Sequence, residues 1–292
     1  MMTRREFGAG ALGLGAAAML GQDASAAGAI LIDSHTHTFV RGLPLAADAR
    51  YVPDYDASDA TLLATAERNG VGRVVISQPS FLGFDNSYLL GALKAHPDRL
   101  RGVPRIEPRT PTKQWDEMGR LGVVGLRFPI RGLALPDWAD YREVMAEAKR
   151  RGWHLHLYED SARLKDSLPV FLESGANVVI PHMGMFDPKL GPKRDDGFKL
   201  LLESAKTGRV YVMLNSPYRT SVEGAALAAP MLLDAFGAER LLWGSDWPHT
   251  NTTLDRVTTY PQMLTALSAW VPDATTRAKI LVDTPTKLFR FA

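Results

Sequence analysis

Two histidines one residue apart follow a short apolar run in the segment LIDSHTHTF, which begins at Leu31. Imidazole groups bind divalent metals, exchange protons and polarise carbonyl groups. In an extended strand alternate side chains share a face, so His35 and His37 are expected to point the same way. The pair is compatible with a metal clamp, with a metal-free polar site and with a strand end that runs out into solvent.

Eight short apolar runs recur along the chain from residue 30, and most are continuous enough in hydrophobicity to be strands buried on both faces. Segments with helical signals separate them, such as those that open at Ser58 and at Asp137. The pattern predicts a single-domain (β/α)8 TIM barrel of the α/β class. A doubly wound open sheet is the second choice, and it would usually carry a glycine-rich phosphate loop after its first strand. The runs are AILIDSH, GRVVISQP, RLRGVPRI, VVGLRFPI, WHLHLYE, NVVIPHMG, RVYVMLNS and RLLWGSDW.

Three segments carry more local expectations. Pro230 lies inside the helical segment VEGAALAAPMLLDAFG and is expected to kink or restart that helix. The stretch from Leu254 to the end is predicted to form one or two helices around Pro272. The polar loop at 185–197 is either a lid over the site or a solvated excursion.

Functional residues of such barrels gather at the C-terminal ends of the strands. Read alone, each polar residue there is more simply a satisfied core group or a loop residue. Their convergence from several strands predicts a site, because an inward imidazole or phenol without a partner is costly. The candidates are His35, His37, Ser80, Arg127, Arg131, His156, Tyr158, His182, Arg219 and Asp246.

The motifs DSHTH, HMG and WGSDWPH, in this order and spacing, resemble the amidohydrolase superfamily. QPSFLGFDNSYLL, GLRFP and HLHLYED are similar to its branch of lactonases that act on 2-pyrone-4,6-dicarboxylate, 4-sulfomuconolactone and sugar lactones. The resemblance covers the chain from about residue 30 to its end and implies a (β/α)8 barrel. It also implies that Asp246 is the catalytic group of the eighth strand, with His35, His37 and His182 beside it.

The same resemblance implies a set of substrate contacts. Arg131 follows Arg127 at a shorter spacing than this branch usually shows, and Leu82 stands where a histidine is commoner. Both departures concern the identity of the substrate and leave the expected fold unchanged. The implied contacts are Tyr51, Ser80, Arg127, Arg131, Tyr158 and Arg219.

Opening a lactone requires a base for water and donors for the carbonyl oxygen. We expect Asp246 to activate the water, while His35, His37 and His182 polarise the carbonyl group. Guanidinium groups bind carboxylates in a bidentate manner, so arginines 127 and 219 are expected to clamp an anionic substrate. The alternative is that these arginines form ion pairs with acidic residues at the barrel rim.

The cofactor remains open at this point. His35, His37, His156 and Asp246 form a possible ligand set for one divalent metal, zinc or manganese. His156 lies where metal-dependent members of the superfamily often place a ligand, whereas the pyrone lactonases more often have glutamine there and are thought to need no metal.

Composition limits the partners. The 34 basic and 32 acidic residues among 292 give a net charge of +2, which favours neither nucleic acid nor an anionic membrane. The absence of cysteine excludes disulfides and thiolate chemistry. The expected partner is a small anionic lactone or carboxylate, and the sequence does not indicate an oligomeric state.

Residues 1–27 read as a twin-arginine signal peptide, and 28–292 as the barrel. Arg4 and Arg5 precede a 13-residue apolar run that is too short to span a bilayer, and ASAA places cleavage after Ala26. This predicts export to the periplasm with no membrane association after cleavage. The alternative is a flexible N-terminal extension.

Three functions fit these residues. The first is a hydrolase that opens an anionic lactone ring by attack of water activated by an aspartate. The second is a metal-dependent, non-oxidative decarboxylase of an aromatic or muconate-type acid. The third is a non-catalytic binder of small acids, which would keep the arginines without needing Asp246 beside three inward histidines.

Overall fold

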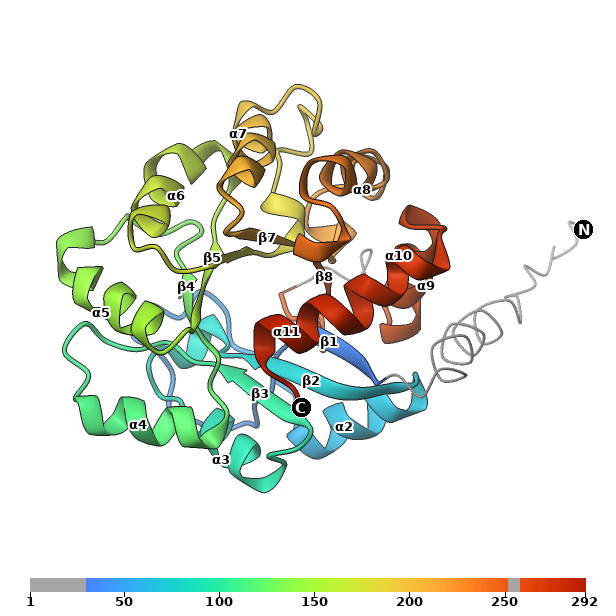
Figure 1. Ribbon diagram of the computed structural model, residues 1–292. Helices are drawn as coiled ribbons and strands as arrows, with labels where there is room; N and C mark the ends of the chain where they lie inside the picture. Colours follow the sequence, from blue (N-terminus) through green and yellow to red (C-terminus); the bar gives the residue numbers. More distant parts are fainter. Residues whose placement is uncertain (1–29, 252–257) are drawn as a thin grey trace, which may run out of the picture.

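The computed structural model describes residues 30–251 and 258–292, so the predicted signal peptide lies outside the described residues. Strands and helices alternate along the chain and form the closed arrangement of Figure 1. The strands are β1 (Leu31–Thr36), β2 (Val71–Ser77), β3 (Leu100–Val103), β4 (Gly125–Pro129), β5 (His154–Tyr158), β6 (Val178–Ile180), β7 (Val210–Leu214) and β8 (Leu241–Trp243). The helices are α2 (Asp59–Arg68), α3 (Ser87–Ala95), α4 (Thr112–Leu121), α5 (Trp138–Arg150), α6 (Leu164–Glu173), α7 (Asp196–Ser204), α8 (Val222–Phe236), α9 (Tyr260–Trp270), α10 (Ala274–Ala278) and α11 (Thr284–Phe289).

Parallel pairing runs through β1-β2-β3 and through β4-β5-β6-β7-β8. Two bridges join these sheets into one ring. Between β3 and β4, the Gly102 N–H donates to the Gly122 carbonyl at 3.1 Å and the Val124 N–H donates to the Gly102 carbonyl at 3.0 Å. Between β8 and β1, the His37 N–H donates to the Trp247 carbonyl at 2.8 Å. The predicted barrel is therefore confirmed, and its closure brings the first and last strands together.

The helices lie around the outside of the strands, and their starts follow the local sequence. Ser58 caps α2 by accepting from the Thr61 N–H, and Asp137 caps α5 by accepting from the Ala139 N–H. Of the two outcomes expected at Pro230, a kink or a restart, the restart is wrong, because α8 continues through this residue from Val222 to Phe236. Within the described residues, no helix is long and apolar enough to cross a membrane.

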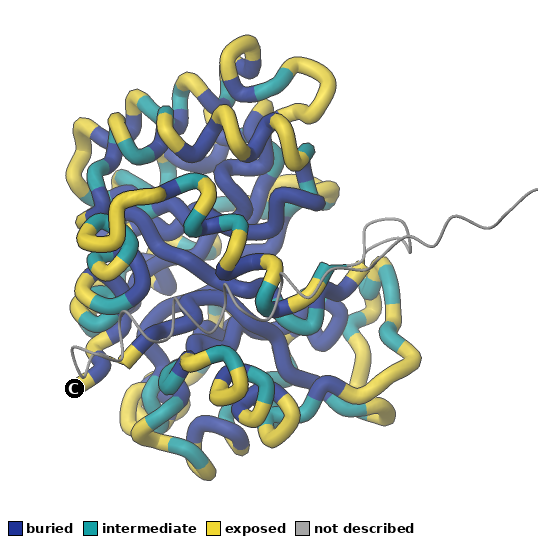
Figure 2. Tube along the Cα trace, turned by 90° about the vertical axis from the view of Figure 1, so that its right-hand side faces the viewer, coloured by how far each residue is buried: buried dark blue, intermediate teal, exposed yellow. Residues whose placement is uncertain are grey.

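The strands separate two apolar layers with different roles. The outer layer packs against the helices and contains Leu155 and Leu157 of β5. Buried positions therefore concentrate on the central strands, while exposed ones lie on the outer sides of helices and loops (Figure 2). The inner layer fills one end of the barrel and consists of Ile32, Val75, Val103, Val124, Val179, Met213, Leu242, Phe289 and Phe291.

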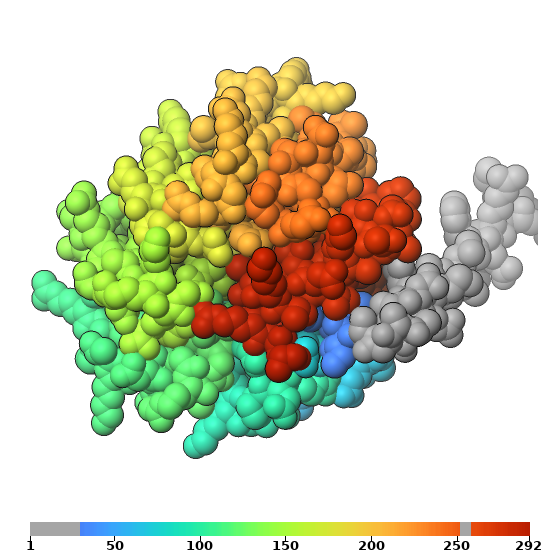
Figure 3. Space-filling model, in the orientation of Figure 1, coloured from blue at the N-terminus to red at the C-terminus, as the bar shows by residue number. Residues whose placement is uncertain are grey.

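The C-terminal segment closes that end of the barrel. α11 crosses the opening in Figure 1, and the same segment covers the centre of this face in Figure 3. Ile32 precedes His35 in its strand and Leu242 precedes Asp246, so the closed end is the one at which the strands begin. The polar residues that follow are thereby left at the opposite, C-terminal end.

Gly125 makes room for a histidine in the barrel interior. A Cβ atom at this position would lie 2.4 Å from the His154 ring, and that ring packs edge-on against Phe289 with centroids 5.4 Å apart. Gly125→Ala is therefore expected to lower the free energy of unfolding by about 1–3 kcal/mol through overpacking. Chemical denaturation measures the change. Gly91→Ala is the control, because a Cβ atom on this exposed helical glycine meets nothing within 4 Å and should be neutral or stabilising. An unchanged free energy in Gly125→Ala would contradict the packing described here.

Candidate active site

A polar pocket of about 70 Å³ opens at the C-terminal end of the barrel. All six residues expected to contact the substrate line it, together with His37 and His182. Three further lining residues, Arg50, Thr250 and Asn251, lie in loops and were not anticipated from the sequence. The full lining is His37, Arg50, Tyr51, Ser80, Arg127, Arg131, Tyr158, His182, Arg219, Thr250 and Asn251.

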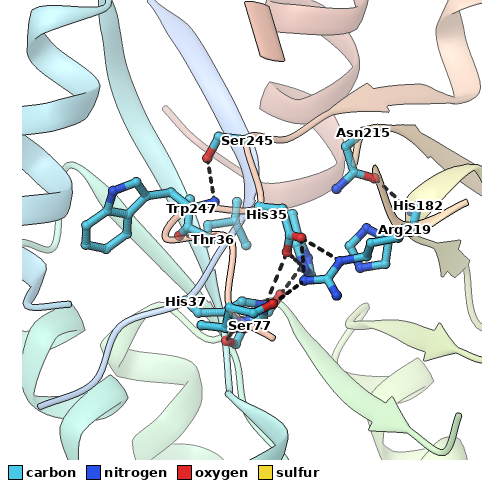
Figure 4. A network of polar contacts seen from close by, with 12 residues as sticks. His35, Thr36, His37, Ser77, His182, Asn215, Arg219, Ser245 and Trp247 are labelled. Carbon is cyan, nitrogen blue, oxygen red and sulfur yellow. Dashed lines mark hydrogen bonds and ion pairs between the residues drawn. The ribbon is translucent and has the colours of Figure 1, made fainter. Parts of the chain in front are cut away.

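Behind the pocket residue His37, two histidines meet one oxygen of the fully buried Asp246. The Nε2 atoms of His35 and His37 lie 3.3 and 3.4 Å from Asp246 Oδ1, and all three residues are buried. The Asp246 N–H donates to the His35 carbonyl at 2.9 Å, so strand closure itself sets this juxtaposition. Figure 4 shows His35 and His37 on one side of the site and Arg219 on the other. The two histidines therefore do not form a strand end that runs into solvent.

The hydrogen bonds of His37 determine which nitrogen carries its proton. Nδ1 lies 2.7 Å from the Ser77 carbonyl oxygen, which only accepts, so Nδ1 donates. Burial lowers the pKa of His37, and the neutral ring then presents a lone pair on Nε2 toward the Asp246 carboxylate. Two acceptors cannot hydrogen-bond to each other, and a cation between them would satisfy both.

The same three residues fit a divalent metal. His35, His37 and Asp246 each offer a ligand atom, and these atoms lie within 4.8 Å of one another. His35 Nε2 and Asp246 Oδ1 are buried and have no hydrogen-bond partner in the described part of the chain. A metal-bound imidazole commonly donates its other N–H to a carbonyl group, as His37 does to Ser77.

His156 and His182 lie beside this group without belonging to it. Each ring has its centroid 5.1 Å from that of His35, but neither residue joins the set whose ligand atoms lie within 4.8 Å. Burial lowers the pKa of both histidines well below the usual value. The His182 ring also lies edge-on to Tyr158, which places it at the pocket wall rather than at its base.

The second oxygen of Asp246 is held from the opposite side. Nε and Nη2 of Arg219 donate to Oδ2, each at 2.7 Å, and the Tyr218 hydroxyl donates to it at 2.5 Å. Burial by itself raises the pKa of Asp246, but the Arg219 guanidinium holds that pKa well below the usual value. The carboxylate is thus ionised and fixed in orientation, with Oδ2 engaged and Oδ1 facing the histidines.

Sequence reasoning did not single out Tyr218. The only available signal was its position directly before Arg219 in SPYR, after the seventh apolar run. Arg219, which was expected to clamp the substrate, lines the pocket but binds Asp246 in this structure. Its role here is to orient the carboxylate.

The other two arginines differ in the charges around them. Arg131 pairs with Asp160, with its Nε 2.6 Å from Oδ1, an ion pair that was not expected from the sequence. Arg127 is buried, donates from Nη1 to the Gln78 carbonyl, and has no ion pair within the described ranges. Burial lowers the pKa of Arg127 to about 10, so it remains charged at neutral pH. Arg127 is therefore a buried cation of the pocket without a carboxylate partner, whereas Arg50, which also has no ion pair in the described chain, is exposed.

The loop at 185–197 is fastened to the protein body. Asp195 accepts hydrogen bonds from the Ser161 hydroxyl, the Asp187 N–H and the Phe198 N–H at 2.7, 2.6 and 2.8 Å. None of the loop residues lines the substrate pocket. In this structure the loop does not cover the pocket, and its residues 187–190 are exposed, as in the alternative of a solvated excursion.

The buried histidines make stability depend on pH. Burial lowers the pKa of His35 and of His154 to about 3, so these rings stay neutral in the fold but take up protons on unfolding below pH 6.5. Their contribution to stability is present above pH 6.5 and falls toward pH 3, by up to about 1.4 kcal/mol per pH unit for each proton. Asp33 acts in the opposite direction, because burial raises its pKa to about 6. The histidines with lowered pKa values are 35, 37, 154, 156, 182 and 249.

We therefore expect the free energy of unfolding to decrease from pH 7 to pH 5, as measured by urea denaturation. His154→Gln should lower the number of protons taken up on unfolding by up to one, and so flatten the dependence of the free energy of unfolding on pH. His154 suits this test because it does not line the substrate pocket and its ring nitrogens have no hydrogen-bond partner in the described chain. If His154→Gln left the slope of the free energy of unfolding against pH unchanged, the His154 ring would not be neutral in the folded protein.

Comparison with known proteins agrees with this barrel and its site. The sequence profile of the amidohydrolase family matches residues 32–291, and the chain belongs to that family. It is 28% identical over 276 residues to the 2-pyrone-4,6-dicarboxylate hydrolase of Comamonas testosteroni, which covers 88% of this chain and 89% of that protein. It is 27% identical over 267 residues to the 4-sulfomuconolactone hydrolase of Rhizobium radiobacter, with coverage of 88% and 89%.

A solved structure shows the same likeness. The Pseudomonas putida protein described as a 2-pyrone-4,6-dicarboxylic acid hydrolase superposes with a TM-score of 0.82 and 36% identity, covering 90% of this chain and 98% of that one. The family resemblance drawn from DSHTH, HMG and WGSDWPH is therefore confirmed.

Proposed function

We propose that this enzyme hydrolyses the ring ester of a small anionic lactone. The observation that carries the proposal is an ionised, oriented carboxylate, Asp246, in contact with the pocket residues His37 and Arg219. The same pocket presents the buried guanidinium of Arg127, which has no ion pair in the described chain. Similarity to hydrolases named for 2-pyrone-4,6-dicarboxylate and 4-sulfomuconolactone supports the same substrate class. Both named substrates carry acidic groups, which match a cationic pocket.

The arrangement gives each residue a task. Arg127 binds an acidic substituent of the lactone and so orients the ring over the base of the pocket. Asp246 takes a proton from the attacking water through Oδ1, because Oδ2 is occupied by Arg219 and Tyr218. His182, at the pocket wall, is placed to donate to the carbonyl oxygen as negative charge develops on it.

The closed inner layer keeps bulk water from the opposite end of the barrel. A divalent metal held by His35, His37 and Asp246 would supply Lewis-acid polarisation of the carbonyl and a lower pKa for the water.

A pH-indicator screen of carboxylated, sulfonated and sugar lactones, run with and without a chelator, tests the proposal. We expect anionic lactones to be hydrolysed faster than their uncharged analogues. Loss of activity on chelation, restored by zinc or manganese, would assign the metal to the three-residue group. Release of CO₂ from an aromatic or muconate-type acid without ring opening would instead support the decarboxylase. Binding of small acids with no turnover at all would support the non-catalytic binder.

We also propose that residues 1–27 direct export through the twin-arginine pathway. The support is the order of Arg4 and Arg5, the short apolar run and ASAA in the sequence. Replacing both arginines with lysine should retain the protein in the cytoplasm, as measured by cell fractionation. Equal periplasmic yields of the two forms would rule out the twin-arginine route.

A further inference from the structure

A second pocket lies apart from the substrate pocket, beside helices α3 and α4. Its volume is about 500 Å³, within the range of small-molecule sites, and it shares no lining residue with the substrate pocket. Its lining is Phe84, Asn86, Ser87, Leu90, Arg105, Ile106, Glu107, Thr110, Gln114, Glu117 and Met118. The combination of one arginine, apolar side chains and two carboxylates restricts what it can bind.

Arg105 is held in place at this pocket. Its backbone is fixed by Asn86, whose Oδ1 accepts from the Arg105 N–H at 3.1 Å and whose Nδ2 donates to the Arg105 carbonyl at 2.7 Å. The guanidinium lies 4.7 Å from the centre of the Phe84 ring, and Nη1 donates to the Ser80 carbonyl at 3.2 Å. The hydrogen bond to Ser80 uses one of the five N–H donors of the Arg105 guanidinium, and the contacts together fix the orientation of that group before any ligand binds.

The charge of Arg105 is not neutralised by the protein. No acidic residue of the described chain forms an ion pair with it, whereas the nearby Arg99 pairs with Glu67. A partly buried guanidinium with free donors on a pocket wall is suited to bind a carboxylate. A carboxylate partner would compensate the desolvation that Arg105 already bears.

The rest of the lining defines the body of the ligand. Ile106 and Met118 are buried, and Leu90 is partly so, which provides an apolar surface beside Arg105. Glu107 and Glu117 are exposed and place two negative charges at the rim. They would repel a second anionic group on the ligand, in contrast to the cationic substrate pocket.

We propose that this pocket, defined by Arg105, Ile106 and Met118 with Glu107 and Glu117 at its rim, binds a small monocarboxylate with an apolar body. The carboxylate pairs with the Arg105 guanidinium, and the apolar body covers Ile106 and Met118. The site is separate from the one that opens the lactone, and the proposal does not depend on the lactone-hydrolase function.

Benzoate is the probe, and NMR of the full protein with ¹³C-methyl-labelled methionine reads out its position. No methionine lines the substrate pocket, so benzoate bound there does not report at Met118. We expect the Met118 signal, assigned with Met118→Leu, to shift saturably with a Kd on the order of 1 mM. The signal of Met213, in the inner layer of the barrel, should stay in place.

Arg105→Gln should weaken benzoate binding at Met118 at least about tenfold. Arg109→Gln is the matched control, because Arg109 is an exposed arginine nearby in sequence that does not line the pocket. The Arg109→Gln protein should bind benzoate as tightly as the native protein does. A Met118 signal that does not move, or an Arg105→Gln protein that binds benzoate as tightly as the native one, would overturn the proposal.

A second comparison is available if Arg105→Gln fails to fold. The dianion terephthalate should bind several-fold more weakly than benzoate, and Glu117→Gln, at the exposed rim, should narrow that difference. Equal binding of the two probes by the native protein would contradict the role assigned to the rim carboxylates, and with it the proposed ligand class.

Discussion

Asp246→Asn is expected to lower kcat for lactone hydrolysis by roughly 1,000-fold or more. The amide cannot accept the proton of the attacking water, and it removes the charge that faces His35 and His37. Steady-state kinetics on the preferred lactone measures the effect. Asp160→Asn, which alters only the rim partner of Arg131, should change kcat little and serves as the control.

The substitution also leaves the Arg219 guanidinium without its carboxylate partner, so a loss of stability has to be separated from a loss of chemistry. Thermal denaturation and substrate binding by the inactive variant provide that separation. A folded Asp246→Asn protein that binds the lactone but does not open it would support the assignment. Near-normal turnover by the same protein would exclude Asp246 as the base.

Arg127→Gln and Arg219→Gln are expected to change different kinetic constants of lactone hydrolysis. Arg127 has no ion-pair partner in the described structure, so its loss should raise KM about 100-fold through a missing contact with the substrate carboxylate. Arg219 binds Asp246 Oδ2, so its loss should act mainly on kcat by releasing the carboxylate from its orientation. Initial rates over a range of lactone concentrations distinguish the two patterns.

The uncharged analogue of the lactone provides an internal control for this pair. Arg127→Gln should affect it little, because there is no acidic group to bind, whereas Arg219→Gln should slow it as much as the anionic lactone. If Arg219→Gln raised KM alone and spared kcat, Arg219 would be a substrate clamp, as its position in the sequence first suggested.

Much of the fold was predictable because it depends on local patterns. Continuous apolar runs separated by helical segments determine a parallel α/β arrangement. In β5 the alternation of side chains follows the same local rule, because Leu155 and Leu157 pack in the outer layer while Tyr158 lines the pocket. The continuation of α8 through Pro230 was not predictable in this way, since packing of the helix outweighs the local preference.

The site was predictable as a set of residues but not as a set of contacts. Strand ends in a closed barrel converge, which predicted that a site forms there. The six substrate contacts came from the resemblance to the lactonase branch, and all of them line one pocket. Which arginine is neutralised depends on side-chain geometry: Arg131 meets Asp160, Arg219 meets Asp246, and Arg127 meets no carboxylate within the described chain. Sequence spacing carries no information about these distances.

The barrel, the family and the residue types at the C-terminal end of the barrel could all be predicted from the chain, because hydrophobic periodicity and short motifs are local properties. The contacts of Asp246 depend on the tertiary structure: Oδ2 accepts from Arg219 and Tyr218, whereas Oδ1 faces His35 and His37. The tertiary structure also decided that His156 stands beside the three-residue group rather than in it. These outcomes depend on closure of the ring between β8 and β1, which brings together residues more than 200 positions apart in the chain.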